Sequence, residues 1–390
     1  MNPAESVKEA PSYEHHKEVI SLAASQNKFT RDLYMKLAEK SSGNVFFSPL
    51  SIMTALGMTY TGASGNTARE MRSLMHLSQD NDALLNAFHD LVKDFKREVA
   101  DYELRTSNMA YVSEKMTLLS DFDHMLREKF LTSCKTVNFD EDEAVRQEIN
   151  AAVEKETNAR IKDLIPQGFF SNLTRMVLVN AVYFKGSWEQ QFMESETFEE
   201  NFWITENESI MVPMMHIKED FRMMHNKDLG AKLLAMDYKG SRLSIVFVLP
   251  DKRDGLPEIE TNLDSLDLNN IDTLMTVEVK VTLPKFKLEE SLDLVSHLRE
   301  MGVRDLFDEG SCDLSRITGN RNLYVSKVVH KAFLEVNEKG SEAAAATGMG
   351  MVTFCYRPNP AVFVADHPFM FYIIDRRAGI VVFAGRFVVP

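Results

Sequence analysis

The sequence predicts an α+β protein with antiparallel sheets, and three observations support this fold class. Helical periodicity dominates the first 100 residues, strand-like patterns dominate from about Met176, and the strand-like segments come from widely separated parts of the chain. The chain has 390 residues, 44% of them hydrophobic, which is enough for a large core. Length alone would favour two or three domains, but no repeat, linker or low-complexity tract divides the chain.

The first 100 residues are expected to be mostly helical. An apolar residue recurs at every fourth position from Phe29 to Leu37, and the Ser-Ser-Gly sequence at 41–43 then interrupts the pattern. A second helix is expected to start at Thr67, because Thr67 and Glu70 have the spacing of a capping box. A third helix has one apolar face, made by Leu84, Leu85, Phe88, Leu91, Val92 and Phe95.

Strands are expected to dominate the second half of the chain. The segments MVLVNAVYF and LSIVFVLP are continuous apolar runs, whereas apolar and polar residues alternate from Val277 to Leu283. Helical segments are expected near residues 144–161 and 291–301. The chain closes with FMFYII, a turn at Asp375–Gly379 and IVVFAGRFVV, a pattern typical of a long hairpin.

The segment YVSKVVHKAFLEVNE has the two alternating rows of side chains that a strand would display. Lysines occupy one face, and the other face carries Val328, His330, Ala332, Leu334 and Val336. This pattern predicts a strand with one face in solvent, so that His330 points inward. A buried histidine is most often a hydrogen-bonded core group, and a catalytic role would therefore require a partner.

Charge and cysteine content exclude several classes of partner. The net charge of -14 and the pI near 5.3 argue against nucleic acid or an anionic membrane. The N-terminus lacks the pattern of a secretory signal, and no apolar run is long enough to span a membrane, so a cytoplasmic protein is expected. Cys134, Cys312 and Cys355 are too dispersed for a disulfide framework or a zinc site. The sequons at Asn172 and Asn207 leave export without a cleaved signal open.

Motifs of catalytic and cofactor sites are missing from the sequence. The stretch from Gly62 to Gly65 has the wrong spacing for a nucleophile elbow, and there is no H-E-x-x-H or C-x-x-C motif. The lysine of a phosphate-binding loop is also missing after Gly57-x4-Gly62, where Ala63 follows. We therefore expect a protein that is not an enzyme and that uses no metal or cofactor.

Residues 338–360, EKGSEAAAATGMGMVTFCYRPNP, have unusually small side chains. Written as a strand, residues 340–352 place their one acid, Glu342, in one row. The opposite row is small and uncharged, so the segment could insert into a sheet; it consists of Ser341, Ala343, Ala345, Thr347, Met349 and Met351. An Ala-rich helix or a flexible loop is the alternative, and in a loop Phe354 would invite cleavage by a chymotrypsin-like protease.

Four motifs resemble serpin signatures in the order that the family has them. They are Asn44-Val-Phe-Phe-Ser-Pro-Leu-Ser51, Leu178 to Trp188, Glu338 to Thr347, and Ala365-Asp-His-Pro-Phe369. The chain resembles a serpin over roughly residues 17 to 390 and is most similar to the intracellular, ovalbumin-like branch. This resemblance implies a single domain of residues 1–390 with about nine helices and three β-sheets. It also implies an exposed reactive centre loop at about residues 338–364.

The resemblance implies an inhibitor of serine proteases that acts as a suicide substrate. Counting seventeen residues from Glu338, as the family does, makes Phe354-Cys355 the bond that a chymotrypsin-like or elastase-like protease attacks. Cys355 or Arg357 could serve as the specificity residue for other proteases. The implied hinge contains no proline, and its row of small side chains contains no bulky or charged residue. The hinge residues are Glu338, Gly340, Ser341, Glu342, Ala343, Ala344, Ala345, Ala346 and Thr347.

Two further groups are implied by the resemblance, and both have conformational roles. Ser48, Ser51, Asn180 and His330 match the hydrogen-bonded shutter beneath the large sheet. Trp188, Lys285 and Glu338 match the breach, where loop insertion starts. For each of these residues, core packing or a surface ion pair is the alternative interpretation.

Other functions and partners stay open at this point. Some serpins are storage, carrier or chaperone proteins, and some members of this branch inhibit papain-like cysteine proteases. The expected partner is a target protease held in a covalent complex by a monomeric inhibitor. Heparin activation is not supported, because acids, among them Asp90 and Asp94, surround Lys93, Lys96 and Arg97 on the third helix.

Overall fold

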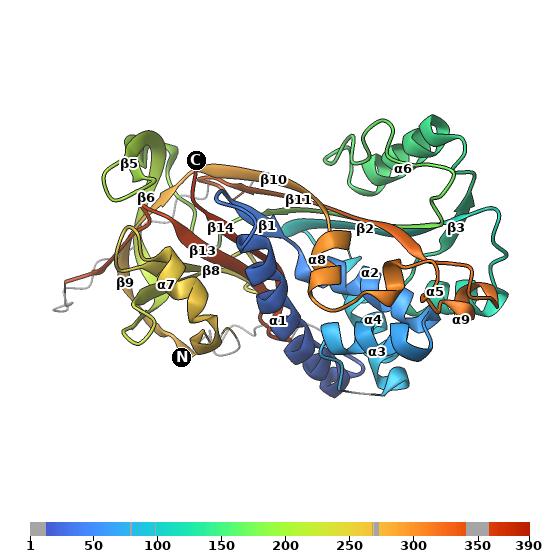
Figure 1. Cartoon of the computed structure of the whole chain (residues 1–390). Coiled ribbons are helices and arrows are strands. Elements are labelled where there is room, and N and C mark those ends of the chain that lie inside the picture. The colour runs from blue at the N-terminus through green and yellow to red at the C-terminus, as the bar shows by residue number, and fades with distance from the viewer. Residues whose placement is uncertain (1–12, 79, 98, 267, 269–272, 341–358) are drawn as a thin grey trace.

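The structure, a computed structural model, describes residues 13–78, 80–97, 99–266, 268, 273–340 and 359–390. Within this part of the chain, nine α-helices and two hydrogen-bonded sheets form the mixed fold shown in Figure 1. The helices are α1 (His16–Ala38), α2 (Pro49–Gly62), α3 (Gly65–Leu74), α4 (Asn81–Phe95), α5 (Ser120–Lys129), α6 (Asp142–Glu156), α7 (Leu256–Thr261), α8 (Val295–Glu300) and α9 (Ser315–Thr318). No helix among the described residues is long and apolar enough to cross a membrane.

No amphipathic pattern in the sequence predicts helix α2. Ser48 caps its N-terminus by accepting a hydrogen bond from the Ser51 N–H, and Pro49 occupies the first helical position, where a missing N–H costs nothing. All of its residues except Thr61 are buried. A helix covered on every side carries no polar stripe, so periodicity alone does not detect it.

The expected capping box at Thr67 is wrong. Helix α3 begins at Gly65, two positions earlier, and both side chains of the supposed box serve a neighbouring segment instead. The Thr67 hydroxyl accepts a hydrogen bond from the Asp313 N–H at 2.9 Å, and the Glu70 carboxylate accepts from the N–H groups of Arg304 and Asp305. The tertiary contact takes the oxygens that a local cap would use.

Five strands form the sheet that matters most for the site. Their order is β10 (Phe286–Asp293), β11 (Val325–Val336), β4 (Met176–Gly186), β2 (Tyr102–Ser113) and β3 (Cys134–Val137). The middle pair, β11 and β4, is parallel, whereas β10 and β2 pair antiparallel with their inner neighbours. The helix expected at 291–301 begins only at Val295, because residues 291–293 still pair with β11.

The other nine strands form one continuous sheet with two parts. One part runs β1 (Val45–Phe47), β14 (Ile380–Phe387), β13 (Phe369–Asp375), β8 (Leu243–Pro250) and β7 (Ala231–Asp237). The 18-residue strand β6 (Ser209–Asn226) connects it to β9 (Met275–Pro284), β12 (Ala361–Val364) and β5 (Thr197–Trp203). With the five-stranded sheet, these two parts account for the three sheets expected. The hairpin of β13 and β14 confirms the prediction for the end of the chain.

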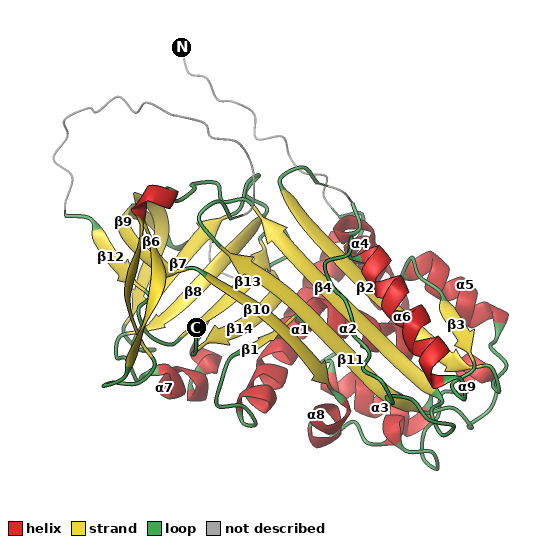
Figure 2. Ribbon diagram, turned by 90° about the horizontal axis from the view of Figure 1, so that it is seen from above, coloured by secondary structure: helices red, strands yellow, loops and turns green. Residues whose placement is uncertain are grey.

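The five-stranded sheet is covered on both faces. Helix α2 contacts β2 and β4 on one side, and α6 lies across the opposite face, as Figure 2 shows from above. The small core under α6 includes Ile149 and Val153, packed against Tyr111, Val177 and Val179 of the sheet. Both rows of β4 are therefore buried except at Lys185, whereas on β11 the row of His330 is buried and the opposite row, from Lys327 to Glu335, is in part exposed.

Candidate functional site

The centre of the five-stranded sheet is the junction between β11 and β4. These strands pair directly and in register from Lys327 opposite Val177 to Leu334 opposite Phe184. They come from segments about 150 residues apart in the sequence, and neither is connected to the other by a short turn. A parallel junction between two antiparallel pairs is the place where a further strand could pair antiparallel to both neighbours.

The structure brings together at this junction the four residues expected to form the shutter, Ser48, Ser51, Asn180 and His330, and we keep that name for this cluster. His330 of β11 and Asn180 of β4 are direct partners across the strands, and a His330 ring nitrogen hydrogen-bonds the Asn180 side-chain oxygen. The other ring nitrogen, Nε2, accepts from the Ser48 N–H at 3.0 Å. The Asn180 amide donates to the hydroxyl of Ser51, and the Ser48 hydroxyl donates to the Val382 carbonyl at 2.7 Å. Helix α2 is thereby fastened to both strands and to β14.

Asn108 of β2 is a member of this cluster that the sequence patterns miss. Its side-chain oxygen accepts from the Ser51 hydroxyl at 2.8 Å and from the Asn180 amide. It extends the network to a third strand of the same sheet. The one available signal is a polar residue inside a run that is otherwise strand-like, and a single sequence does not indicate which group it faces.

His330 is neutral in this environment. The side chain is fully buried, and burial lowers the pKa of the imidazole to about 3. One nitrogen accepts the Ser48 N–H, so the other nitrogen carries the proton and donates to Asn180. The ring therefore has a hydrogen-bond partner on each side and lacks a nucleophile to activate, which favours a structural role over general-base catalysis.

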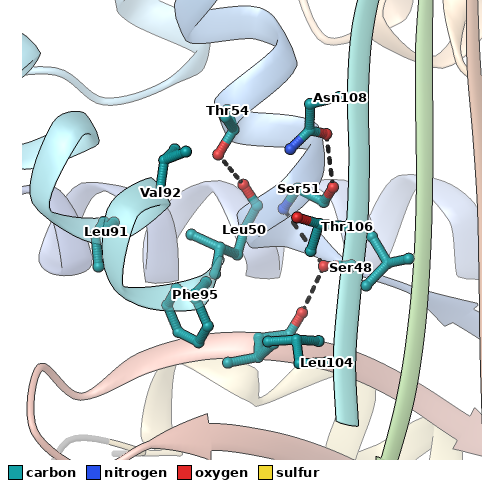
Figure 3. Close-up of a pocket in the computed structure, with 12 residues that line it drawn as sticks. Ser48, Leu50, Ser51, Thr54, Leu91, Val92, Phe95, Leu104, Thr106 and Asn108 are labelled. Carbon is teal, nitrogen blue, oxygen red and sulfur yellow. Dashed lines mark hydrogen bonds between the residues drawn. The ribbon is translucent and has the colours of Figure 1, made fainter. Parts of the chain in front are cut away.

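A small cavity adjoins the shutter beneath the sheet. Figure 3 shows Ser48, Ser51 and Asn108 on one side of it and the apolar side chains of Leu91, Val92 and Phe95 from α4 on the other. The space open to a water-sized sphere is about 20 Å³, room for about one molecule. The cavity lies on the β2 side of the shutter, between residues of β2, β4, α2 and α4.

The three residues expected to form the breach, Trp188, Lys285 and Glu338, also lie together, at the end of β11, and we keep that name for this cluster. The Glu338 carboxylate pairs with the Lys285 ammonium at 2.9 Å and accepts from the Thr197 hydroxyl at 3.0 Å. Trp188 contacts the main chain rather than the carboxylate: its indole N–H donates to the Asn337 carbonyl at 2.8 Å, and its main-chain N–H donates to Lys339. Sequence reasoning did not identify Thr197.

Two further features tighten the breach. The Trp188 ring stacks on Tyr238 with the ring centroids 4.5 Å apart. Gly340 has φ +73°, and a Cβ built on it would lie 2.4 Å from the Trp188 nitrogen and 2.5 Å from the Gly186 carbonyl oxygen. Glycine is required here both by the left-handed backbone and by the close approach of the chain to β4.

The charge of Glu338 is held by its surroundings. Burial alone would raise the pKa of this carboxyl, but hydrogen bonds with its own N–H, with Lys285 and with Thr197 outweigh burial and lower the pKa. The Glu338 side chain is 8% exposed, whereas the Lys285 side chain is 45% exposed. The ion pair therefore joins a buried anion to a cation that stays in contact with solvent.

The expected reactive bond lies outside the described residues. This holds for Phe354, Cys355 and Arg357, and for the hinge residues Ser341, Glu342, Ala343, Ala344, Ala345, Ala346 and Thr347. The described chain ends at Gly340 beside Trp188 and resumes at Asn359, two residues before β12. Strand β12 belongs to the nine-stranded sheet, where it pairs parallel with β9. The segment between these two anchors thus connects the two sheets.

The structure corrects the expectation that acidic side chains surround the lysines and the arginine at the end of α4. Asp90 and Asp94 are buried rather than spread among the lysines. Asp90 accepts from the His15 N–H at 2.7 Å, and Asp94 pairs with two arginines from distant segments. Asp90, His15 and Glu14 also bring three potential metal-ligand atoms within 4.8 Å, but the hydrogen bond from the His15 N–H, which anchors the start of α1 to α4, explains the position of Asp90.

Comparison with known proteins gives one consistent result. The family model "Serpin (serine protease inhibitor)" matches residues 24–390. Human leukocyte elastase inhibitor is 37% identical, covering 95% of this chain and 99% of that protein, and human Serpin B3 is 36% identical, covering 95% and 100%. The crystal structure of Serpin48, described as a highly specific serpin of the insect Tenebrio molitor, superposes with a TM-score of 0.85 at 31% identity, covering 95% and 98%. The sequence Thr353-Phe354-Cys355 and the distance from Cys355 to Ala365-Asp-His-Pro-Phe369 predict a similarity to leukocyte elastase inhibitor, and the comparison confirms it.

Proposed function

The chain belongs to the serpin family, and from this premise we propose that it inhibits chymotrypsin-like or elastase-like serine proteases as a suicide substrate. The observation that carries the proposal is the parallel β11–β4 junction with its shutter and breach. The chain leaves this junction at Gly340, and the proposed reactive centre loop, about residues 338–364, returns to β12 of the other sheet.

The proposed reaction begins as an ordinary proteolysis. The serine of the target protease attacks the carbonyl carbon of Phe354, an ester forms, and the Phe354–Cys355 peptide bond breaks to release the amine of Cys355. The freed loop, starting from the hinge at 340–347, then inserts between β11 and β4. Roughly 14 inserted residues at about 3.3 Å each span about 45 Å, far enough to carry the tethered protease across the molecule before the ester is hydrolysed.

Insertion releases energy that the uncleaved molecule stores. The inserted strand forms two ladders of main-chain hydrogen bonds and replaces the one between β11 and β4, and the net gain of one ladder, at about 1 kcal/mol per hydrogen bond, supplies about 5 to 10 kcal/mol. This is comparable to the whole stability of an ordinary domain, about 5 to 15 kcal/mol. The uncleaved form would then be metastable and held by a kinetic barrier. The Glu338–Lys285 pair and the His330–Asn180 hydrogen bond both cross or flank the path of the inserting strand.

The decisive experiment mixes the protein with chymotrypsin, elastase and trypsin. We expect a complex that survives denaturant with chymotrypsin or elastase, and mass spectrometry should find a released C-terminal fragment that begins at Cys355. Complete cleavage at Phe354 without any stable complex would show a substrate and not an inhibitor. Cleavage after Arg357 by trypsin should yield mostly free fragments, because it changes the length of the tether.

The hinge provides a variant that separates inhibitor from substrate. Ser341→Arg places a long charged side chain on the row that must pass beneath the sheet, and burying an unpaired charge is costly. Insertion should slow, so that the ester is hydrolysed first and chymotrypsin is released active. The matched control is Glu342→Arg on the opposite row, which should inhibit nearly as well as the wild type. Equal trapping by Ser341→Arg and the wild type would contradict the insertion step.

Two other functions are separated by the same assays. A storage, carrier or chaperone serpin would be cleaved without forming a stable complex and without gaining thermal stability. A cross-class inhibitor would trap a papain-like cysteine protease as a thioester and leave serine proteases active. Inhibition of serine proteases is favoured because the hinge residues 341–347 carry no proline and no bulky side chain.

We also propose that the inhibitor works as a monomer in the cytoplasm and needs no cofactor. Cys134 and Cys312 are buried free thiols, and burial raises the pKa of each to about 12, so neither is reactive. Free thiols of this kind suit a reducing compartment. Fractionation of cells that express the full chain, with immunodetection of the intact protein, tests the location.

A further inference from the structure

The contact between helices α1 and α4 brings together three side chains that can ligate a metal ion. They are Glu14 and His15, which directly precede α1, and Asp90 in the second half of α4. One ligand atom of each residue, a carboxylate oxygen or an imidazole nitrogen, lies within 4.8 Å of the other two. None of these residues belongs to the shutter or the breach, and the proposed function does not use them.

Main-chain and packing contacts hold the residues around His15 in place. Tyr13 is buried, and the guanidinium of Arg377 lies 5.0 Å from the centre of its ring. The His15 carbonyl accepts from the Val19 N–H at 3.0 Å, and the His15 N–H donates to the Asp90 carboxylate at 2.7 Å. The His15 side chain does not cap the helix. The backbone therefore brings the imidazole to Asp90 and leaves the ring available to another partner.

The Asp90 carboxylate is nearly buried and lacks a cationic partner from lysine or arginine. Its side chain is 4% exposed, and within the described residues its one hydrogen bond comes from the His15 N–H. No described lysine or arginine forms an ion pair with Asp90 or with Glu14. Asp94, one turn later on α4, pairs with two arginines. Because a buried carboxylate without a cation is costly, the cluster is suited to a positively charged ligand.

The spacing between His15 and Asp90 fits a shared metal ion. The Nδ1 atom of His15 is buried, lies 3.3 Å from the Oδ2 atom of Asp90 and makes no hydrogen bond with any described residue. Nitrogen–oxygen hydrogen bonds are usually shorter, about 2.7–3.2 Å. Two ligand atoms at about 2.0–2.1 Å from one tetrahedral zinc ion lie about 3.3–3.4 Å apart. The two atoms therefore have the separation of neighbouring zinc ligands.

We propose that Glu14, His15 and Asp90 bind a zinc ion, with water as the fourth ligand. The two carboxylates balance its charge, and the imidazole nitrogen favours zinc over calcium and magnesium, which take oxygen ligands in larger numbers. The Oδ2 atom of Asp90 can bind the ion and still accept the His15 N–H, because a carboxylate oxygen has two lone pairs. Glu14 is exposed, so its side chain can rotate toward the other two ligands. The ion stabilises the contact between α1 and α4, and inhibition does not require it.

Binding is tested with zinc chloride on the full chain after treatment with EDTA, by competition with a chromogenic chelator. We expect the wild type to bind one zinc ion more than His15→Gln and to unfold at a higher temperature as zinc is added. Zinc held by the thiol of Cys355 or by other histidines remains in the variant and cancels in this difference. Cobalt(II) in place of zinc should give the intense visible absorption of a tetrahedral site in the wild type only. Equal zinc binding by the two proteins, or the weak absorption of octahedral cobalt, would overturn the proposal.

The neighbouring histidine provides the matched control. His16 is exposed and lies outside the cluster, so His16→Gln should bind zinc as the wild type does. His15→Gln should weaken binding at least about tenfold, because even the loss of a group that only orients a ligand has an effect of this size. Asp90→Asn keeps an oxygen for the His15 N–H and removes the charge, so it should also weaken binding, which separates loss of a ligand from loss of the anchor.

The outcomes for the site and for the proposed function are independent. Equal weakening by His15→Gln and His16→Gln would place the zinc at surface histidines and overturn the site. The His15 side chain makes no hydrogen bond with a described residue, so without zinc His15→Gln should unfold at the wild-type temperature. If zinc binds but the chain traps no protease, the proposed function fails and the site stands; a chain that traps protease without binding zinc gives the opposite result.

Discussion

The shutter joins β4 to β11, whereas the breach holds the end of β11 against other segments, and the two do so by opposite physical means. At the shutter, His330 and Asn180 are neutral, buried and joined by hydrogen bonds to two further side chains and to the main-chain N–H of Ser48. At the breach, Glu338 is a buried anion whose partner, Lys285, is nearly half exposed. Buried neutral networks are costly to break, whereas ion pairs with an exposed partner contribute little net stability. We therefore propose that the middle of the junction carries most of its stability and that the end sets where it opens.

Removing the shutter histidine should have the largest effect. His330→Ala leaves the Ser48 N–H and the Asn180 side chain without partners and opens a cavity in the sheet, so we expect a loss of about 3–5 kcal/mol in the free energy of unfolding. Denaturant unfolding of the intact protein measures it. His124→Ala, whose side chain is 71% exposed on α5, is the control and should cost less than about 0.5 kcal/mol. Similar losses in both would contradict the role of the network.

The second largest loss of stability is expected when the close contact of Gly340 with β4 is disturbed. Gly340→Ala forces a left-handed backbone on alanine and drives its Cβ into main-chain atoms of residues 186–188, so we expect a loss of at least about 2 kcal/mol. Gly168→Ala is a matched control, because its φ of +69° is similar and no atom lies within 4 Å of the added Cβ. It should cost about 1 kcal/mol. The difference in unfolding temperature between the two variants measures the effect of the close contact of residue 340 with residues 186–188. Equal shifts would mean that this contact does not contribute to stability.

The sequence predicts the contacts of the shutter and those of the breach to different extents. The alternation along residues 325–336 places His330 inward, and the structure confirms that position. The residues that meet it were available only through the resemblance to serpins, because Ser48 and Asn180 come from distant segments and no local pattern links them. Asn108 was missed for the same reason. At the breach, Lys285 and Glu338 were expected, but the contact of Trp188 with main-chain atoms depends on backbone positions that sequence does not encode locally.

The errors in the predicted elements have the same cause. Helix α2 lacks a polar stripe because it is buried on all sides, and Thr67 and Glu70 lack a local cap because tertiary partners take their oxygens. The sequence patterns did not predict strand β2, because the polar residues that face the shutter and the cavity interrupt its apolar positions. Long periodic segments such as α1, α4, β8 and β14 were predictable, since burial on one face or on both faces repeats along them.

Acidification should distinguish the two regions. The folded pKa of His330, about 3, lies below its unfolded value near 6.5, so the unfolded chain binds the proton more readily and stability falls as pH drops through 6.5 toward 3. The slope is at most about 1.4 kcal/mol per pH unit. The lowered pKa of Glu338 gives stability that is present above its unfolded value and is lost only at lower pH, as pH falls through the folded pKa.

The His330 contribution is measured by unfolding the wild type and His330→Gln between pH 6.5 and 5.5. Glutamine can still hydrogen-bond but does not titrate, so the variant should show a shallower fall, and the difference should approach about 1 kcal/mol over this interval. The Glu338 carboxyl stays ionised throughout the interval and contributes nothing to the difference. Parallel curves for the two proteins would mean that His330 is not the group that titrates.

The smallest effect on stability is expected at the breach ion pair, where the effect on rate should be larger. Lys285→Met removes an exposed partner and should cost less than about 1 kcal/mol, a loss that shrinks further in high salt. Lys218→Met, which breaks a comparable pair with Glu278, should cost about the same. If the breach sets where the junction opens, Lys285→Met alone should accelerate loop insertion after cleavage, followed as the rate at which a trapped protease loses activity. Equal rates in the two variants would mean that the pair is an ordinary surface contact and that opening is controlled at the shutter.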